Sequence, residues 1–272
     1  MSAPWIAALP MYDFPALADA HERLWSALKR QLERAGLADV PAGLTRDRNP
    51  EELWSDPRLL LGQGCEYPLA KLFGERIRLV ATPRYTVPGC HGATYRSAVL
   101  VRKTDPAKTL ADLRGRRCVI NERYSNSGMN LLRASIAPVA GGPRFFESVE
   151  VSGSHRQSVQ SVAAGEAEVC AVDCVTKVHL ERLYPAGGIG ALRVLHWTAA
   201  TPSLPMIASA AASVETIAGI RAALKGLMLD PALGATRARL YLEGFDLAPR
   251  GAFSEVLHLE REASRLGYPE LI

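Results

Sequence analysis

The stretch Arg117-Cys-Val-Ile-Asn-Glu-Arg-Tyr-Ser-Asn-Ser-Gly-Met-Asn130 decides how the middle of this chain folds. Its apolar residues up to Ile120 predict a buried strand that ends at Asn121. The Ser-Asn-Ser segment at 125–127 consists of preferred helix-capping residues, and a helical pattern continues from it to Ala137. The stretch therefore predicts a strand, a short polar loop and a helix in direct succession.

The same succession occurs again further along the chain. A strand at 149–154 leads into a helix at 155–164, and a strand at 167–172 leads into a helix at 173–183. Short strands that alternate with helices form βαβ units. We therefore expect an α/β protein in which each sheet is mostly parallel and is flanked by helices.

Two extended segments, at 95–97 and at 198–205, interrupt this alternation. The residues between them contain enough strands and helices to form a lobe of their own. We predict a discontinuous first lobe formed by residues 1–96 and 200–272, and a second lobe formed by residues 97–199. The ligand cleft is expected between the two lobes.

Composition excludes several classes of protein. The chain has 272 residues and a net charge of +4, and its basic residues are dispersed, so we expect no nucleic-acid partner. No apolar run approaches the roughly 20 residues that span a bilayer, so we expect no membrane insertion. The first residues lack the basic and apolar regions of a signal peptide, which predicts a cytoplasmic protein unless a leader has been removed.

The five cysteines do not form a metal-binding or Cys-x-x-Cys motif. Cys118 and Cys170 lie in apolar runs and are typical core residues. Cys65 and Cys90 both lie in turns rich in glycine and proline, and a disulfide between these two is a hypothesis that the sequence alone does not decide.

Small polar residues follow three of the expected strands. Ser125, Asn126, Ser127 and Gly128 stand where a helix begins, and there the unpaired N–H groups and the helix dipole attract a phosphate, phosphonate or carboxylate group. The alternative is a helix cap with no ligand. His155 and Asp173 also follow strands; they are candidate ligand contacts, or a surface residue and a helix cap.

Ser127, His155 and Asp173 are also the residue types of a hydrolase triad. The chain lacks the Gly-x-Ser-x-Gly elbow that exposes such a serine, and it has no phosphate-loop, dinucleotide-binding or zinc-binding motif. The pattern favours binding without a cofactor or metal over catalysis.

Four segments in this order and spacing resemble the phosphate, phosphite and phosphonate substrate-binding proteins of ABC transporters. They are Tyr95-Arg-Ser-Ala-Val-Leu-Val-Arg, Leu110-Ala-Asp-Leu-Arg-Gly-Arg-Arg-Cys-Val-Ile-Asn, Ser125-Asn-Ser-Gly-Met-Asn, and the segment from Gly153-Ser-His to Ala171-Val-Asp173. The likeness is close over 95–173 and weaker towards both ends of the chain.

This resemblance implies a type II periplasmic-binding fold, with two α/β lobes and a ligand held between them. It assigns the anion to the loop that contains Ser125 to Gly128. It adds His155, Asp173 and the aromatic Tyr95 as contacts, and Tyr12 in the loop after the first strand as a further candidate. Gln63, where another strand ends, completes the predicted ligand-binding residues.

The resemblance also implies a function. We expect a monomeric solute-binding protein that closes over a small phosphonate-like anion, acts with an ABC permease and is located in the periplasm. The middle residue of the anion loop is often threonine in phosphonate binders and is Asn126 here, so a carboxylated metabolite is an alternative ligand. The rival hypothesis is a cytoplasmic enzyme on the same fold, of the menaquinone or pyrimidine pathway type, with His155 and Asp173 as its catalytic groups.

Overall fold

The computed structural model describes residues 4–247, 251 and 253–272. The contacts within the chain divide it into two compact units. The described residues of unit 1 lie within 1–86, 91–93 and 202–252, and those of unit 2 within 87–90, 94–201 and 253–272. A two-stranded sheet of β4 (Thr94–Tyr95) and β10 (Thr201–Pro202) lies at the points where the chain passes from one unit to the other.

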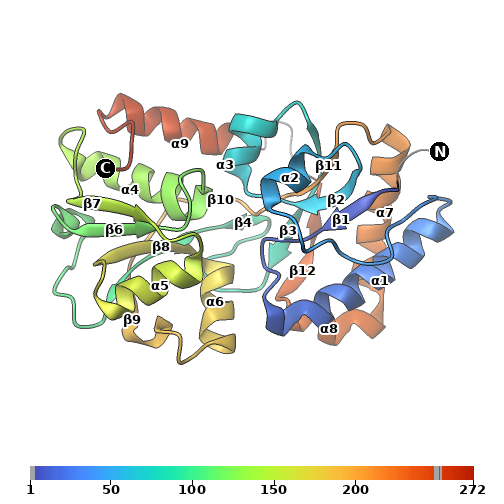
Figure 1. Ribbon diagram of the computed structural model, residues 1–272, viewed down its shortest axis with the longest axis horizontal. Coiled ribbons are helices and arrows are strands. Elements are labelled where there is room, and N and C mark those ends of the chain that lie inside the picture. Colours follow the sequence, from blue (N-terminus) through green and yellow to red (C-terminus); the bar gives the residue numbers. More distant parts are fainter. Residues whose placement is uncertain (1–3, 248–250, 252) are drawn as a thin grey trace. The chain divides into compact units, whose positions relative to one another are not determined.

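Unit 1 contains a five-stranded sheet in the order β1-β2-β11-β3-β12 (Figure 1). Only β1 and β2 run parallel among its described strand pairs, because β11 is antiparallel to β2 and β3, and β12 is antiparallel to β3. The strands are Ile6–Ala8, Leu59–Gln63, Met206–Ser209, Ile77–Tyr85 and Leu242–Asp246, in sheet order.

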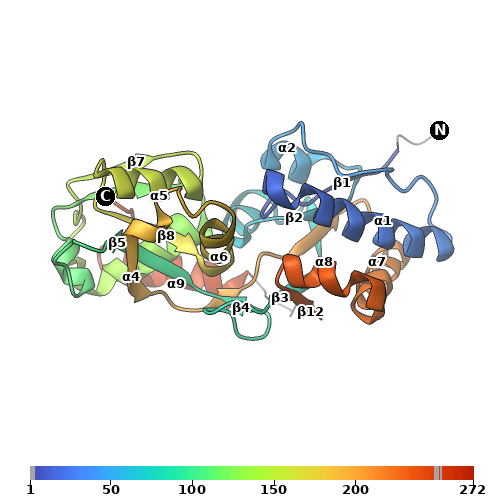
Figure 2. The ribbon, with the colours of Figure 1, turned by 90° about the horizontal axis from the view of Figure 1, so that it is seen from below.

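Helices α1 (Ala18–Arg34), α7 (Val214–Leu229) and α8 (Gly234–Arg239) pack together in unit 1, as Figure 2 shows. The apolar positions of α1 recur every three or four residues, so one face of the helix is buried. Trp25 and Leu28 lie on this face. The shorter helices of unit 1 are η1 (Pro15–Leu17), α2 (Pro50–Ser55), α3 (Glu66–Pro68), η2 (Leu69–Phe73) and η6 (Pro231–Leu233).

Unit 2 contains a second five-stranded sheet in the order β7-β6-β8-β5-β9. Strand β6 runs parallel to β7 and β8, whereas β5 is antiparallel to β8 and β9. The strands are Ser148–Val151, Arg117–Ile120, Val169–Asp173, Ser97–Arg102 and Leu192–Trp197, in sheet order.

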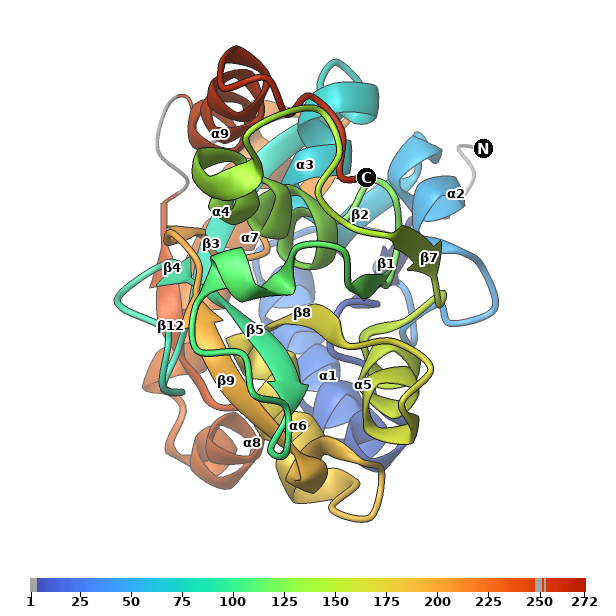
Figure 3. The same ribbon diagram turned by 90° about the vertical axis from the view of Figure 1, so that its left-hand side faces the viewer.

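The helices of unit 2 cover both faces of its sheet. The chain crosses from β6 to β7 through α4 (Leu131–Ala140) and returns from β7 to β8 through α5 (His155–Ala164). Because both crossovers are right-handed and run in opposite directions, they place α4 and α5 on opposite faces. Figure 3 shows α4 with α9 (Ser254–Arg265) on one face, and α5 with α6 (Cys174–Leu183) on the other. The remaining turns are η3 (Leu110–Leu113), η4 (Asn126–Asn130) and η5 (Ile189–Ala191).

The structure confirms the alternation of strands and helices and corrects three expectations. Both sheets are mixed rather than mostly parallel, because strands distant in sequence enter them in the antiparallel sense. Strand β12 was not predicted. Residues 253–272 pack with unit 2 rather than with the first lobe, because α9 lies against α4 and Phe145 N–H donates to the Ile272 carbonyl at 2.8 Å.

The structure contains no disulfide between Cys65 and Cys90, and their pairing stays a prediction. All five cysteines are free in the described residues. The sulfur of Cys90 lies instead 3.4 Å from Cys174 Sγ. Within the part of the chain that the structure describes, there is no helix with the length and apolarity of a membrane span and no cluster of metal-ligating residues.

Candidate anion-binding site

The polar candidates of unit 2 gather where β6 and β8 end. These neighbouring parallel strands continue into loops that lead to helices on opposite faces of the sheet. Such a reversal opens a crevice at the carboxyl ends of the strands, and ligands of open α/β sheets bind in that crevice. The loop after β6 supplies residues 125–128, and Asp173 is the last residue of β8.

The loop after β6 begins a helix with an irregular first turn. Ser125 is the capping residue, and its Oγ accepts the Gly128 N–H at 3.0 Å. Residues Asn126–Asn130 form the π-helical turn η4, which continues directly into α4. π-Helical turns are rare and are frequent at functional sites.

Gly128 permits a close approach that no other residue allows. A Cβ atom at this position would lie 1.9 Å from Asn121 Oδ1 and 3.2 Å from His155 Cε1. The Asn121 oxygen is buried and has no hydrogen-bond partner among the described residues. Gly128 therefore lets the loop pack against the end of β6, with an unused acceptor beside it.

Asn126 holds the loop in place through its side chain. It is fully buried, and its Nδ2 donates to Tyr95 Oη at 2.9 Å and to Thr201 Oγ1 at 3.1 Å. Its Oδ1 accepts a hydrogen bond from Asn130 Nδ2 at 2.9 Å. These contacts tie the loop to Tyr95 and Thr201, and the predicted contacts of Asn126 and Tyr95 with a ligand stay predictions.

His155 joins the loop to the end of β8. It is the first residue of α5, after the capping residue Ser154. Its Nε2 shares a hydrogen bond of 2.9 Å with Ser127 Oγ and lies 3.6 Å from Asp173 Oδ2. Burial lowers the pKa of His155, although the Asp173 carboxylate and the Ala171 carbonyl oppose this effect. The lowered pKa favours the neutral form of the imidazole.

This geometry differs from that of a hydrolase triad. In a triad, the serine contacts one ring nitrogen of the histidine and the carboxylate contacts the other. Here Ser127 and Asp173 both approach the same nitrogen, Nε2 of His155. The carboxylate therefore does not hold the imidazole in the orientation from which it removes the serine proton.

The two carboxylate oxygens of Asp173 make different contacts. Its Oδ1 caps α6 by accepting the Thr176 N–H at 2.8 Å, and its Oδ2 faces His155. The residue is only 2% exposed. A negative charge placed against Ser127 and His155 would approach this carboxylate, so the site favours a ligand that also donates hydrogen bonds.

The two remaining candidates, Tyr12 and Gln63, lie in unit 1 and meet there at Tyr85. Gln63 Nε2 donates to Tyr85 Oη at 3.1 Å and to the Leu204 carbonyl at 3.2 Å. The Tyr12 ring packs edge-on against the Tyr85 ring, with centroids 5.4 Å apart. Their contact with a ligand stays a prediction.

Sequence reasoning missed four residues: Asn121, Asn130, Thr201 and Tyr85. Asn121 could have been found, because it directly follows a predicted strand at the edge where ligands bind. No local signal identifies Thr201, which reaches Asn126 only because the chain returns 75 residues later.

Unit 1 has a depression lined by residues that include Arg48, Asp56 and Arg58. Both guanidinium groups bind Asp56 Oδ2, each at 2.7 Å. These contacts, with Arg58 first, hold the pKa of Asp56 well below its usual range. Because this depression pairs its charges internally, it is a weaker candidate for anion binding than the residues at the ends of β6 and β8.

Solved structures confirm the two-lobed type II periplasmic-binding fold. A binding-protein component of an ABC phosphonate transporter from Pseudomonas aeruginosa has 14% identity and a TM-score of 0.74, over 97% of this chain and 88% of that one. PhnD1 of Prochlorococcus marinus, solved with methylphosphonate, has 13% identity and a TM-score of 0.76, over 96% and 98%. A Xanthomonas citri protein bound to ATP has 16% identity and a TM-score of 0.73, over 97% and 98%.

No curated protein sequence matches this chain significantly. The family model described as the periplasmic substrate-binding protein of phosphonate ABC transporters matches residues 66–250, which is more than half of the chain. This match covers the anion loop, His155 and Asp173, and it confirms the resemblance seen in the sequence. The chain therefore belongs to the periplasmic substrate-binding proteins of phosphonate ABC transporters.

Proposed function

We propose that unit 2 binds the phosphorus oxyanion of a small ligand at the start of η4, and that the protein delivers this ligand to an ABC permease. The observation that carries the proposal is the 2.9 Å hydrogen bond between Ser127 Oγ and His155 Nε2 at the end of parallel strands. The Ser127 hydroxyl and the His155 imidazole, which are hydrogen-bonded to each other in the structure, can both bind an anion instead.

The local electrostatics support an oxyanion at this position. The amides of η4 and the dipole of α4 give the loop a partial positive charge. The hydroxyl groups of Ser125 and Ser127 lie 3.4 Å apart, so one tetrahedral group can accept hydrogen bonds from both. Each such bond to a charged group contributes about 1.5–3 kcal/mol.

The acceptors around the loop narrow the class of ligand. Asp173 is a carboxylate, and Asn121 Oδ1 is a buried acceptor without a partner among the described residues. A ligand that carries a P–OH group or an ammonium group would donate to these atoms. Sulfate has no such donor at neutral pH, so we expect the protein to prefer phosphonates or phosphate to sulfate.

The structures of similar proteins agree with this chemistry. Methylphosphonate and ATP, bound by the Prochlorococcus and Xanthomonas proteins, both present tetrahedral phosphorus oxyanions. The predictions that Tyr12 and Gln63 contact the ligand, and that the lobes close over it, belong to the same proposal. Periplasmic location, implied by the family, would place the protein where it meets its permease.

Calorimetry on the purified protein tests the proposal with methylphosphonate, phosphate, phosphite, sulfate and ATP as separate ligands. We expect micromolar or tighter binding of at least one phosphorus oxyanion and much weaker binding of sulfate. Ser127→Ala should weaken this binding about 10- to 100-fold, since it removes a donor to a charged group. Ser135→Ala is the matched control, because the Ser135 hydroxyl donates to the Leu131 carbonyl within α4.

Two results would contradict the proposal. One is binding that Ser127→Ala and Ser135→Ala affect equally. The other is a bound compound that is recovered chemically altered, as measured by phosphorus NMR, which would support the rival enzyme hypothesis.

A further inference from the structure

Two cysteines of unit 2 lie next to each other beside the anion-binding site. Cys90 lies in the segment Val87–Cys90, and Cys174 is the first residue of α6, directly after Asp173. Their sulfur atoms are 3.4 Å apart. Both are reduced in the structure, and neither has a role in the proposed binding of an oxyanion.

The backbone on each side holds the two sulfur atoms together. Cys90 N–H donates to the Val87 carbonyl and Cys174 N–H donates to the Arg96 carbonyl, each at 3.0 Å. Gly89 has a φ angle of +102°, and a Cβ atom there would lie 2.8 Å from Cys174 Cβ. Only glycine allows this approach, so the segment is shaped to place Cys90 against α6.

We propose that Cys90 and Cys174 are a redox pair that forms a disulfide when an oxidised disulfide compound or a thiol oxidoreductase reacts with it. The sulfur atoms are farther apart than the roughly 2.05 Å of an S–S bond, and side-chain rotation would bring them into bonding distance. The pair lies within one unit, so its oxidation does not depend on ligand binding.

The difference in exposure sets the order of the reaction. Cys174 is fully buried, whereas Cys90 is partly exposed. Cys90 loses its proton to water and attacks the disulfide of the oxidant, which releases one thiol and leaves a mixed disulfide. Cys174 then loses its proton, attacks Cys90 Sγ and releases the second thiol. Two protein thiols are oxidised and one disulfide is reduced to two thiols.

Cys118 and Cys170 are poorly placed for this reaction. Cys118 and Cys170 are fully buried in β6 and β8, and burial raises the pKa of the Cys170 thiol to about 12. The contact with Cys174 and burial also raise the pKa of Cys90. Oxidation of the pair at neutral pH is therefore slow without a catalyst, because the thiolate is the attacking form.

The disulfide would fasten the segment Val87–Cys90 to the residue that follows Asp173. The closed loop would run from residue 90 to residue 174, and a loop of this length strongly restricts the unfolded chain. We expect oxidation to raise the melting temperature by on the order of 5–10 °C, reversibly with a reductant.

Peptide mapping tests the proposal on the full chain without ligand. The protein is incubated with oxidised glutathione and protein disulfide isomerase, blocked, and digested with trypsin and an endoproteinase that cleaves before aspartate. We expect two of the five thiols to become unreactive, and peptide 85–96 to be linked to peptide 173–177. Each of these peptides contains a single cysteine.

Three variants complete the test. After treatment with the oxidant, Cys90→Ser and Cys174→Ser should each keep their four remaining thiols reactive. Their melting temperatures should not rise. Cys65→Ser, the matched control, should still lose two thiols and gain thermal stability. A different linked pair, or an unchanged thiol count in the folded wild-type protein, would overturn the proposal. A failure to bind oxyanions would leave these results unaffected, so the two proposals can fail separately.

Discussion

At the edge of the unit 2 sheet where β6 and β8 begin, Arg117 and Glu168 form a two-pronged ion pair, with N–O distances of 3.2 and 2.5 Å. At the edge where the same two strands end, Asp173 faces the hydrogen-bonded pair of Ser127 and His155, and Asn121 Oδ1 lies beside Gly128. Both edges belong to the same two strands, yet they differ in how many of their polar groups have hydrogen-bond or ion-pair partners within the protein.

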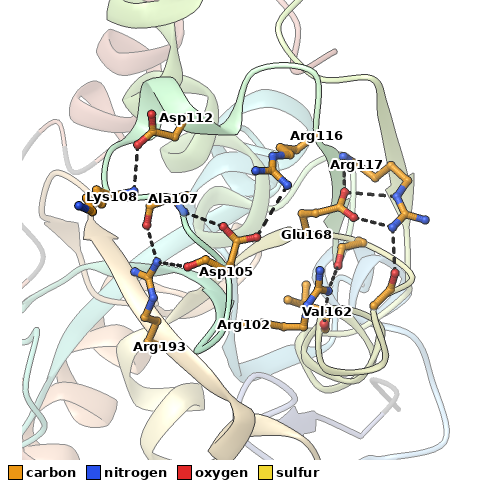
Figure 4. A network of polar contacts seen from close by, with 12 residues as sticks. Arg102, Asp105, Ala107, Lys108, Asp112, Arg116, Arg117, Val162, Glu168 and Arg193 are labelled. Atoms are coloured by element: carbon orange, nitrogen blue, oxygen red, sulfur yellow. Dashed lines mark hydrogen bonds and ion pairs between the residues drawn. The ribbon is translucent and has the colours of Figure 1, made fainter.

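The first edge satisfies its charges internally (Figure 4). Arg117 also donates to the Gly165 carbonyl, and Arg102 donates to the carbonyls of Val162 and Ala167 at 2.9 Å. Contact with Arg117 holds the pKa of Glu168 below its usual range. An edge built in this way stabilises the unit and offers little to an anion.

The second edge keeps its hydrogen-bonding capacity. Its imidazole is buried and neutral, its asparagine oxygen has no partner among the described residues, and its glycine leaves room for a close approach. Unpaired buried polar groups cost free energy, and such groups persist where a ligand satisfies them. The comparison indicates that polar residues at the end of a strand mark a site only when their bonds are incomplete.

The largest expected effect is a loss of oxyanion affinity when a bulky apolar side chain replaces a hydroxyl at the second edge. Ser127→Leu should abolish oxyanion binding, with at least a 100-fold loss of affinity, because it removes a donor and fills the space beside Gly128. The melting temperature of the ligand-free protein should change far less than the affinity. Calorimetry and thermal unfolding measure both quantities, and normal binding by this variant would show that the loop is wrongly assigned.

The stability contributed by the second edge should depend on pH through His155. Its pKa is lowered in the folded state, so the unfolded chain takes up this proton first as the pH falls. The stability that depends on neutral His155 is complete above its unfolded pKa of about 6.5 and decreases as the pH falls below that value. The melting temperature of the wild-type protein should therefore fall more steeply from pH 7 to pH 5 than that of His155→Gln. Parallel curves would show that the imidazole is not held neutral.

Breaking the first edge should affect stability and leave binding unchanged. Glu168→Gln removes the charge that pairs with Arg117, which is half exposed, so we expect a loss of about 1 kcal/mol in the free energy of unfolding. Because the folded-state pKa of Glu168 is lowered, this contribution is present above its unfolded pKa of about 4.3 and is lost in more acidic solution. Urea unfolding at pH 7 and pH 3.5 measures this difference, and a reduced affinity for the oxyanion would contradict the separation of the two edges.

The sequence predicted the second edge better than the overall topology. Strand periodicity and capping residues located β6, η4 and the start of α5, because these signals are local. The positions of Ser127, His155 and Asp173 then followed from the rule that parallel strands present their carboxyl ends together. The predicted loop, His155 and Asp173 do meet in the structure.

Contacts between distant parts of the chain were not predictable in this way. Strand β12 pairs with β3 across more than 150 residues, and α9 joins unit 2 after the chain has passed through unit 1. The turn signals at Cys65 and Cys90 likewise carry no information on which sulfur atoms lie close together, and the sulfur close to Cys90 is that of Cys174. Nor does any local pattern show that the Asn126 amide binds Tyr95 and Thr201.

The smallest expected effect concerns the buried Asn126 amide, which connects the loop of the second edge to Tyr95 and Thr201. Tyr95→Phe removes one acceptor from Asn126 Nδ2 and leaves Thr201 Oγ1 as the other, so the side chain keeps a partner. We expect a loss of about 1 kcal/mol in stability and a fall in oxyanion affinity of less than about tenfold.

Thr201→Val is the complementary variant, because it leaves Tyr95 as the acceptor. If Asn126 positions the loop, the double variant should weaken binding by more than the product of the two single effects, since the amide then loses both acceptors. Simple additivity in calorimetry would show that Asn126 has no part in holding the anion loop.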